Sequence, residues 1–141
     1  DMINNGGGSL DLGLKMAYAM TNQPLKVPGI QFKTSDSWMD EFESASNTAQ
    51  SDVHREIARR VLVSMEDSKK QGDRLSQSFP VTVLAPYSFA PNYNLKKPFK
   101  VALLVNEMCA SMCDIFTAIL KDNGLATVVG TRTMGAGGNV V

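Results

Sequence analysis

An apolar run that leads directly into a serine-containing turn limits the folds open to this chain more than any other feature. Residues 101–105 (Val-Ala-Leu-Leu-Val) have the composition and length of a buried strand, and residues 112–123 have the spacing of a helix. Ser111 therefore lies where a strand gives way to a helix N-terminus, a place where main-chain N–H groups and the helix dipole favour negative charge. A serine there is well placed to act as a nucleophile whose oxyanion is held by main-chain amides.

The same serine has a structural alternative. Ser111 followed three residues later by Asp114 also fits a capping box, and serine is among the commonest helix N-caps. These residues alone favour the cap over the nucleophile, so other parts of the chain must decide between the two.

Composition indicates an ordinary globular chain that is long enough for one domain with a real core. The 141 residues include 14 basic and 14 acidic side chains, and a net charge of zero leaves no electrostatic footprint for nucleic acid or an anionic membrane. No apolar run approaches the ~18 residues that a membrane span needs. The chain starts without Met and has strand-like runs at both ends, so we expect an internal piece of a larger protein.

The cysteines and the histidine predict no metal site and no second nucleophile. Cys109 and Cys113 are the only cysteines and His54 is the only histidine, whereas a zinc site needs about four ligands. A disulfide between residues four apart at a helix start needs close Cβ atoms, so two buried free thiols that pack in the core are expected. His54 falls on the polar face of a helix, and we expect it at the surface rather than beside Ser111.

Short apolar strands that alternate with helices predict an α/β fold with a largely parallel sheet covered by helices. Because residues 101–105 do not alternate with polar ones, that strand is expected to be buried. Most of the larger aromatic side chains are expected in the core, with a minority lining a substrate groove: Trp38, Phe42, Phe79, Tyr87, Phe89 and Tyr93. The expected elements are helices at 9–21, 38–42, 53–72 and 112–122, strands at 30–33, 100–105 and 126–131, and an apolar stretch at 81–84.

Four motifs in order carry a family resemblance. They are Asn-Asn-Gly-Gly-Gly at 4–8, Cys-Ala-Ser-Met-Cys-Asp-Ile-Phe at 109–116, Leu-Lys-Asp-Asn-Gly-Leu-Ala-Thr-Val-Val-Gly at 120–130 and Gly-Ala-Gly-Gly at 135–138. Together they resemble the catalytic domain of the tail-specific (carboxy-terminal processing) serine proteases. Gly-Ala-Gly-Gly and residues 19–26 are most similar to the branch of the chlamydial protease-like activity factor and the tricorn-like enzymes.

This resemblance implies a serine endopeptidase and a Clp-protease/crotonase-like superhelix of strand-strand-helix units. The chain would be part of one catalytic domain. Residues 1–28 would form the glycine turn and its helix, residues 29–98 a largely helical insertion, and residues 99–141 the strand-helix-strand unit of the nucleophile.

The resemblance also implies roles for individual residues. Ser111 would be the nucleophile, with the N–H of Met112 and that of Gly7 or Gly8 as oxyanion donors. Ala136 stands where the tail-specific branch has the lysine of its Ser–Lys dyad, so that dyad is excluded. The tricorn-like branch uses a Ser–His–Glu arrangement, whose histidine and glutamate would lie outside residues 1–141. The chain by itself is then expected to be inactive, because an unassisted serine hydroxyl is a poor nucleophile.

The expected partner is a polypeptide substrate, with neither cofactor nor metal. A homo-oligomer, or the remaining parts of the parent chain, could complete the site. Relatives are usually exported, which implies a periplasmic, envelope or secreted location. Two alternatives stay open: a non-catalytic relative that binds peptides or a partner, and a crotonase-type acyl-thioester enzyme, whose expected basic adenine-binding patch is not visible in the sequence.

Overall fold

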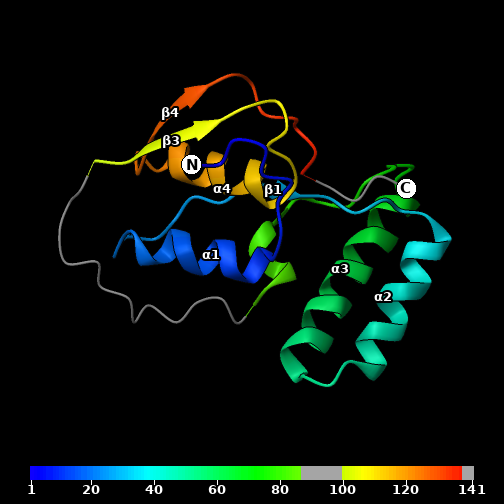
Figure 1. Cartoon of the computed structure of the whole chain (residues 1–141). Helices are drawn as coiled ribbons and strands as arrows, with labels where there is room; N and C mark the ends of the chain where they lie inside the picture. Colours follow the sequence, from blue (N-terminus) through cyan, green and yellow to red (C-terminus); the bar gives the residue numbers. More distant parts are fainter. Residues whose placement is uncertain (87–99, 138–141) are drawn as a thin grey trace. The chain divides into compact units, whose positions relative to one another are not determined.

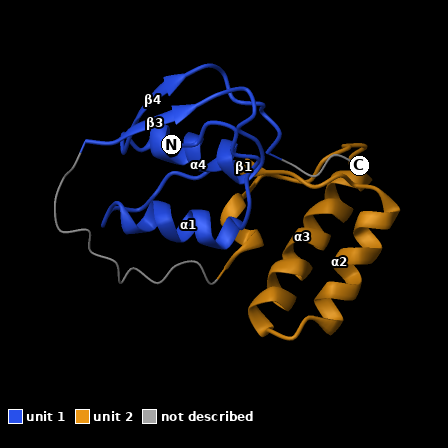
Figure 2. Ribbon diagram, viewed as in Figure 1, with its two compact units in different colours: residues 1–28, 87–141 blue, residues 29–86 orange. Residues whose placement is uncertain are grey.

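The computed structural model describes residues 1–86 and 100–137, and it divides the chain into two compact units (Figure 2). Unit 1 comprises Asp1–Pro28 and Tyr87–Val141, and unit 2 comprises Gly29–Pro86. Several sequence predictions lie outside the described residues: those for Tyr87, Phe89 and Tyr93, the end of the 29–98 insertion, and the residues from Gly138 onward.

Unit 1 is built on a parallel pair of strands. β3 (Ala102–Val105) pairs with β4 (Thr127–Gly130), with Ala102 opposite Thr127. α4 (Met112–Asp122) connects the two strands and lies along one face of the pair, and α1 (Leu10–Ala19) packs on α4 (Figure 1). At the other edge of β3, the N–H of Met2 donates to the carbonyl of Leu104 (2.9 Å). The predicted α/β class is confirmed.

The helix ends in unit 1 follow local sequence signals. The Ser9 hydroxyl accepts the N–H of Leu12 and so caps the start of α1. At the end of α4, Gly124 has φ +65° and the N–H of Leu125 donates to the carbonyl of Leu120 (2.8 Å). That pair of features is a Schellman motif, and glycine suits the positive φ that the motif requires.

One face of β3 is covered and the other is open. Leu103 and Val105 are buried, whereas Ala102 is exposed and Leu104 keeps 37% of its surface exposed. The predicted burial of this strand therefore holds for one face only, within the part of the chain that is described. The physical reason is that α1 packs on α4, so the helices of this unit stack on the same side of the strands instead of sandwiching them.

Unit 2 is a helical hairpin with a short ribbon. α2 (Asp36–Thr48) and α3 (Asp52–Lys70) pack side by side (Figure 1). β1 (Gly29–Ile30) pairs antiparallel with β2 (Phe79–Pro80), and the 3₁₀ helix η1 (Val81–Leu84) occupies the predicted apolar stretch. α3 matches its prediction, whereas α2 extends well past the single turn expected at 38–42.

Unit 2 has a hydrophobic core of its own. Val61, Met65 and Phe79 are buried, with Trp38 and Phe42 packed against them. The rings of Phe32 and Phe42 meet edge to face, with their centroids 4.9 Å apart. The predicted core position is confirmed for Phe79, whereas Trp38 and Phe42 are partly buried at the edge of the core. None of the helices in the described ranges has the length and apolar character to cross a membrane.

Candidate active site at the strand–helix turn

Ser111 joins β3 to α4 in an unusual backbone conformation. Its φ is +55° and its ψ is −122°, a combination that is costly for any residue with a Cβ. The residue is exposed, and its side chain makes no capping hydrogen bond to α4. The capping-box alternative is therefore not what the structure shows. In α/β-hydrolases, a sharp turn between a strand and a helix presents the nucleophilic serine.

Asp114, the second residue of that capping box, contacts a different segment. Its carboxylate accepts the N–H of Gly135 and the N–H of Ala136, both at 3.0 Å. The carbonyl of Ala136 in turn accepts the N–H of Ser111 (2.8 Å). Asp114 thus fixes Gly135 and Ala136 against the turn that carries the serine.

Gly7 packs directly against the same turn. A Cβ built on Gly7 would lie 2.7 Å from the carbonyl oxygen of Ala110, 2.8 Å from the Cβ of Ser111 and 2.9 Å from the nitrogen of Met112. Gly7 also has φ +101°, so both space and backbone conformation require glycine. The N–H of Ala110 donates to the carbonyl of Asn5 (3.1 Å), which ties the two segments together.

The main-chain amides around Ser111 are not equivalent. The N–H of Gly7 donates to the Asn5 side-chain oxygen (2.8 Å), and the N–H of Ser111 donates to the carbonyl of Ala136. The N–H groups of Met112 and Gly8 have no acceptor among the residues described. Met112 is the first residue of α4, where an N–H has no partner within the helix. Two of the amides in these segments therefore have no acceptor among the residues that the structure describes.

The Met112 side chain is buried between α4 and α1. Only 6% of its surface is exposed, and a Cβ on Gly13 of α1 would come within 2.8 Å of its Cγ and 3.0 Å of its Sδ. Sequence reasoning did not single out Gly13. A glycine inside a helical pattern, which costs about 1 kcal/mol relative to alanine, is the signal that could have found it.

Cys109 and Cys113 form a disulfide that brackets Ser111. Their Cα atoms are 5.3 Å apart, within the range that a disulfide spans, and both residues are buried, as predicted. The expectation of two free thiols is wrong. A regular helix start would keep the two cysteines too far apart, whereas the positive φ of Ser111 folds the chain sharply between them.

Comparison with known proteins assigns the family. The model of peptidase family S41 matches residues 1–140. The chain belongs to peptidase family S41. This confirms the membership expected from the four motifs.

The S41 chain is similar to longer chlamydial proteins. It is 29% identical to an uncharacterized protein of Chlamydia muridarum and 30% identical to a protein of Chlamydia pneumoniae, in each case over 99% of this chain. It covers 27% and 26% of those proteins, respectively. The chain therefore spans about a quarter of the length of these relatives.

Solved structures share the fold of the S41 chain. Mature CPAF superimposes with a TM-score of 0.62 and 24% sequence identity, over 97% of this chain and 30% of that one. The structure of mature CPAF complexed with lactacystin gives the same values.

The surroundings of two further polar residues of the S41 chain, His54 and Glu107, are described by the structure. His54 is exposed on α3 in unit 2, which confirms its predicted surface position. Glu107 follows β3, and its carboxylate accepts a hydrogen bond from the Thr131 hydroxyl (2.9 Å). Its own backbone N–H and that hydroxyl hold the pKa of Glu107 below its usual range. Among the residues described, no cluster of three His, Cys, Asp or Glu side chains could hold a metal ion.

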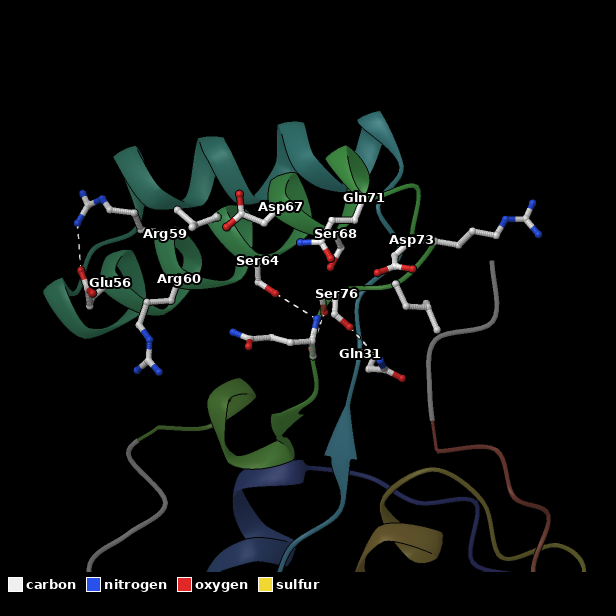
Figure 3. Close-up of a pocket in the computed structure, with 14 residues that line it drawn as sticks. Gln31, Glu56, Arg59, Arg60, Ser64, Asp67, Ser68, Gln71, Asp73 and Ser76 are labelled. Atoms are coloured by element: carbon white, nitrogen blue, oxygen red, sulfur yellow. Dashed lines mark hydrogen bonds and ion pairs between the residues drawn. The ribbon is translucent and has the colours of Figure 1, made fainter.

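Unit 2 also contains an open cavity of about 970 Å³ between α3 and the residues that follow it (Figure 3). Among the residues that line it, the N–H of Gln77 donates to the hydroxyl of Ser64 (3.1 Å) and Arg59 pairs with Glu56. Its charged lining consists of Glu56, Arg59, Arg60, Asp67, Asp73 and Arg74. Acidic and basic side chains balance, so the lining does not favour a ligand of one charge.

Proposed function

We propose that the chain carries the nucleophile of a serine endopeptidase that cleaves polypeptides through an acyl-enzyme, with Ser111 as that nucleophile. The observation that carries the proposal is the backbone of Ser111, with φ +55° at a strand–helix junction and a side chain that does not cap the helix. A serine held in a costly conformation where its hydroxyl stays available indicates chemistry rather than capping.

The oxyanion donors in this proposal are the N–H of Met112 and the N–H of Gly8. Both lack an acceptor among the described residues, whereas the N–H of Gly7 is already bonded to Asn5. Gly7 would serve a different purpose: without a Cβ, it lets the glycine turn approach Ser111 closely. Amides fixed before the reaction stabilise the developing oxyanion without having to reorient.

The proposed reaction has two halves. The Ser111 oxygen bonds to the substrate carbonyl carbon while its proton passes to a general base, and the C–N bond then breaks as that base protonates the departing amine. Water hydrolyses the resulting ester and restores the serine. The base and its orienting acid would be a histidine and a glutamate outside residues 1–141.

Fluorophosphonate labelling of the full-length protein tests the proposal. The probe reacts with a serine that has a working base and oxyanion hole, so we expect one adduct, mapped to Ser111 by mass spectrometry and absent in Ser111→Ala. Ser9→Ala is the matched control, because Ser9 caps α1 in the same unit and its loss should leave the adduct in place. A folded protein that forms no adduct would favour the non-catalytic, peptide- or partner-binding alternative.

Two finer features belong to the same proposal. The parallel β3–α4–β4 unit is proposed as one turn of a Clp-protease/crotonase-like superhelix. The compartment is proposed to be the periplasm, the envelope or the outside of the cell. The Cys109–Cys113 disulfide supports this location, because disulfides persist in oxidising compartments. Fractionation of cells, followed by thiol alkylation without reductant, would test both the compartment and the oxidation state.

A further inference from the structure

The Cys109–Cys113 disulfide encloses the part of the turn that the proposed chemistry needs. Ala110, Ser111 and Met112 are the three residues between the two cysteines. They include the proposed nucleophile and one proposed oxyanion donor. Both cysteines are buried, so the bridge lies beneath the turn rather than at the surface.

The sequence of this turn is compatible with a second conformation. Ser-x-x-Asp is a capping box, in which Ser111 would adopt the ordinary extended backbone of an N-cap and its hydroxyl would bond to the helix amides. In the structure neither half of that box forms. The Ser111 hydroxyl makes no cap, and Asp114 holds Gly135 and Ala136 instead. The turn thus has two alternatives, one with the hydroxyl available and one with it used by the helix.

We propose that the Cys109–Cys113 disulfide holds Ser111 in the available conformation, so that oxidation of this pair switches the peptidase on and reduction switches it off. The inference rests on the proposed function of Ser111. Cys109 and Cys113 are positioning residues here, since they act through the backbone of the turn and not on the substrate. A covalent link across four residues removes the freedom that the turn would need to relax into the capped state.

The switch is a two-electron exchange with a dithiol. A thiolate of the dithiol attacks one sulfur of the bridge and forms a mixed disulfide, and the other cysteine leaves as a thiolate. The second thiol of the reagent then closes its own ring and releases the remaining cysteine. The protein gains two electrons and two protons, and the dithiol becomes a cyclic disulfide. Because both cysteines are buried, the exchange requires the turn to open locally.

The test compares full-length protein before and after reduction with dithiothreitol. We expect fluorophosphonate to label Ser111 about tenfold to a hundredfold more slowly after reduction, in line with the cost of strained backbone that the bridge would no longer hold. Removal of the reductant and reoxidation should restore the rate. The double variant Cys109→Ala/Cys113→Ala should label slowly and respond to neither treatment, which separates the bridge from other effects of the reagent.

Hydrogen exchange gives a readout that does not depend on activity. On reduction, the amides of Ser111, Gly135 and Ala136 should exchange faster, because the first donates to Ala136 and the other two donate to Asp114. Amides in α3 should not change. Equal labelling rates and unchanged exchange in the two states would overturn the inference, as would two free thiols in protein purified without reductant. If the oxidised protein does not label at all, the proposed function fails, and the exchange data alone decide whether the bridge holds the turn.

Discussion

Ser111 adopts a backbone conformation that costs an L-residue on the order of 1–3 kcal/mol. A cheaper state is available to serine at a helix start, since an N-cap contributes about 1 kcal/mol of stability. Ser111 does not form that cap, and hydrogen bonds from neighbouring residues stabilise the turn instead. The carbonyl of Asn5 accepts the N–H of Ala110, and the carbonyl of Ala136 accepts the N–H of Ser111. The carboxylate of Asp114 accepts the N–H of Ala136. Strain at this one residue is thus supported by the segments on either side of it.

Gly7→Ala should damage this turn, whereas Gly6→Ala should not. The new Cβ at position 7 would lie within 3 Å of three atoms of the turn, at a φ that alanine avoids. We expect a loss of about 1–3 kcal/mol in unfolding free energy and a strong fall in fluorophosphonate labelling. Gly6 has open space for a Cβ, so its change should lie within about 1 kcal/mol of the parent. Urea denaturation of both variants measures the difference, and equal losses would contradict this account.

Asp114→Asn should loosen the segment that follows β4. The carboxylate accepts two amides, and an asparagine offers a single neutral oxygen in its place. We expect a loss of about 1–3 kcal/mol in stability, with slower labelling of Ser111. Asp122→Asn at the exposed C-terminal end of the same helix is the matched control, and removal of a negative charge there should be neutral or slightly stabilising. If the two variants behave alike in denaturation, Asp114 has no special role.

Helix packing in unit 1 depends on a size match between α1 and α4. Gly13 leaves the space that the Met112 side chain fills, and Met112 also supplies a proposed oxyanion donor through its backbone. A bulky residue directly after the serine is therefore accommodated by a glycine almost a hundred positions earlier in the chain. The packing of α1 thus determines which side chain fits at the first residue of α4.

A double-mutant cycle tests this match. Gly13→Ala should destabilise the parent by about 1–3 kcal/mol through overpacking against Met112. In a Met112→Ala background the same change should become neutral or stabilising by up to about 1 kcal/mol, because alanine favours the helix and nothing is left to collide with. The unfolding free energies of the four proteins give the coupling, and additive effects would show that the two residues do not share one space.

Periodicity predicted α1, α3, α4, β3 and β4 because each carries an apolar stripe or run that depends only on nearby residues. Periodicity did not predict three features of the structure. The length of α2 depends on packing against α3, the open face of β3 depends on where the helices stack, and the disulfide depends on the backbone of Ser111. Each is a property of tertiary structure, which a short window of sequence does not contain.

In the candidate site, too, some features follow from sequence motifs and others only from the structure. Ser111, Met112, Gly7 and Gly8 were reached through motifs, whereas the roles of Asn5 and Asp114 required the hydrogen bonds. The side-chain oxygen of Asn5 accepts the N–H of Gly7. Of these two glycines, it is therefore Gly8 whose N–H has no acceptor among the described residues. A motif identifies the residue types of a turn but does not say which amide in it is already bonded.

At the scale of the whole molecule, the two units have separate cores. Leu120 lies in that of unit 1 and Met65 in that of unit 2. Leu120→Ala and Met65→Ala should each cost about 2–5 kcal/mol. If the units open separately, hydrogen exchange should accelerate within 29–86 for Met65→Ala and in the described parts of unit 1 for Leu120→Ala. Faster exchange throughout the chain in both variants would instead indicate a single cooperative unit.

The dihedral angles of Ser111 have a consequence for protein engineering. Glycine adopts such angles with little strain, so among the natural amino acids it should be the most stabilising choice at this position. A thermal-stability screen, or a design procedure that scores folding alone, would therefore favour Ser111→Gly and remove the one hydroxyl that the turn presents. Selection for robustness and selection for catalysis would choose different residues here.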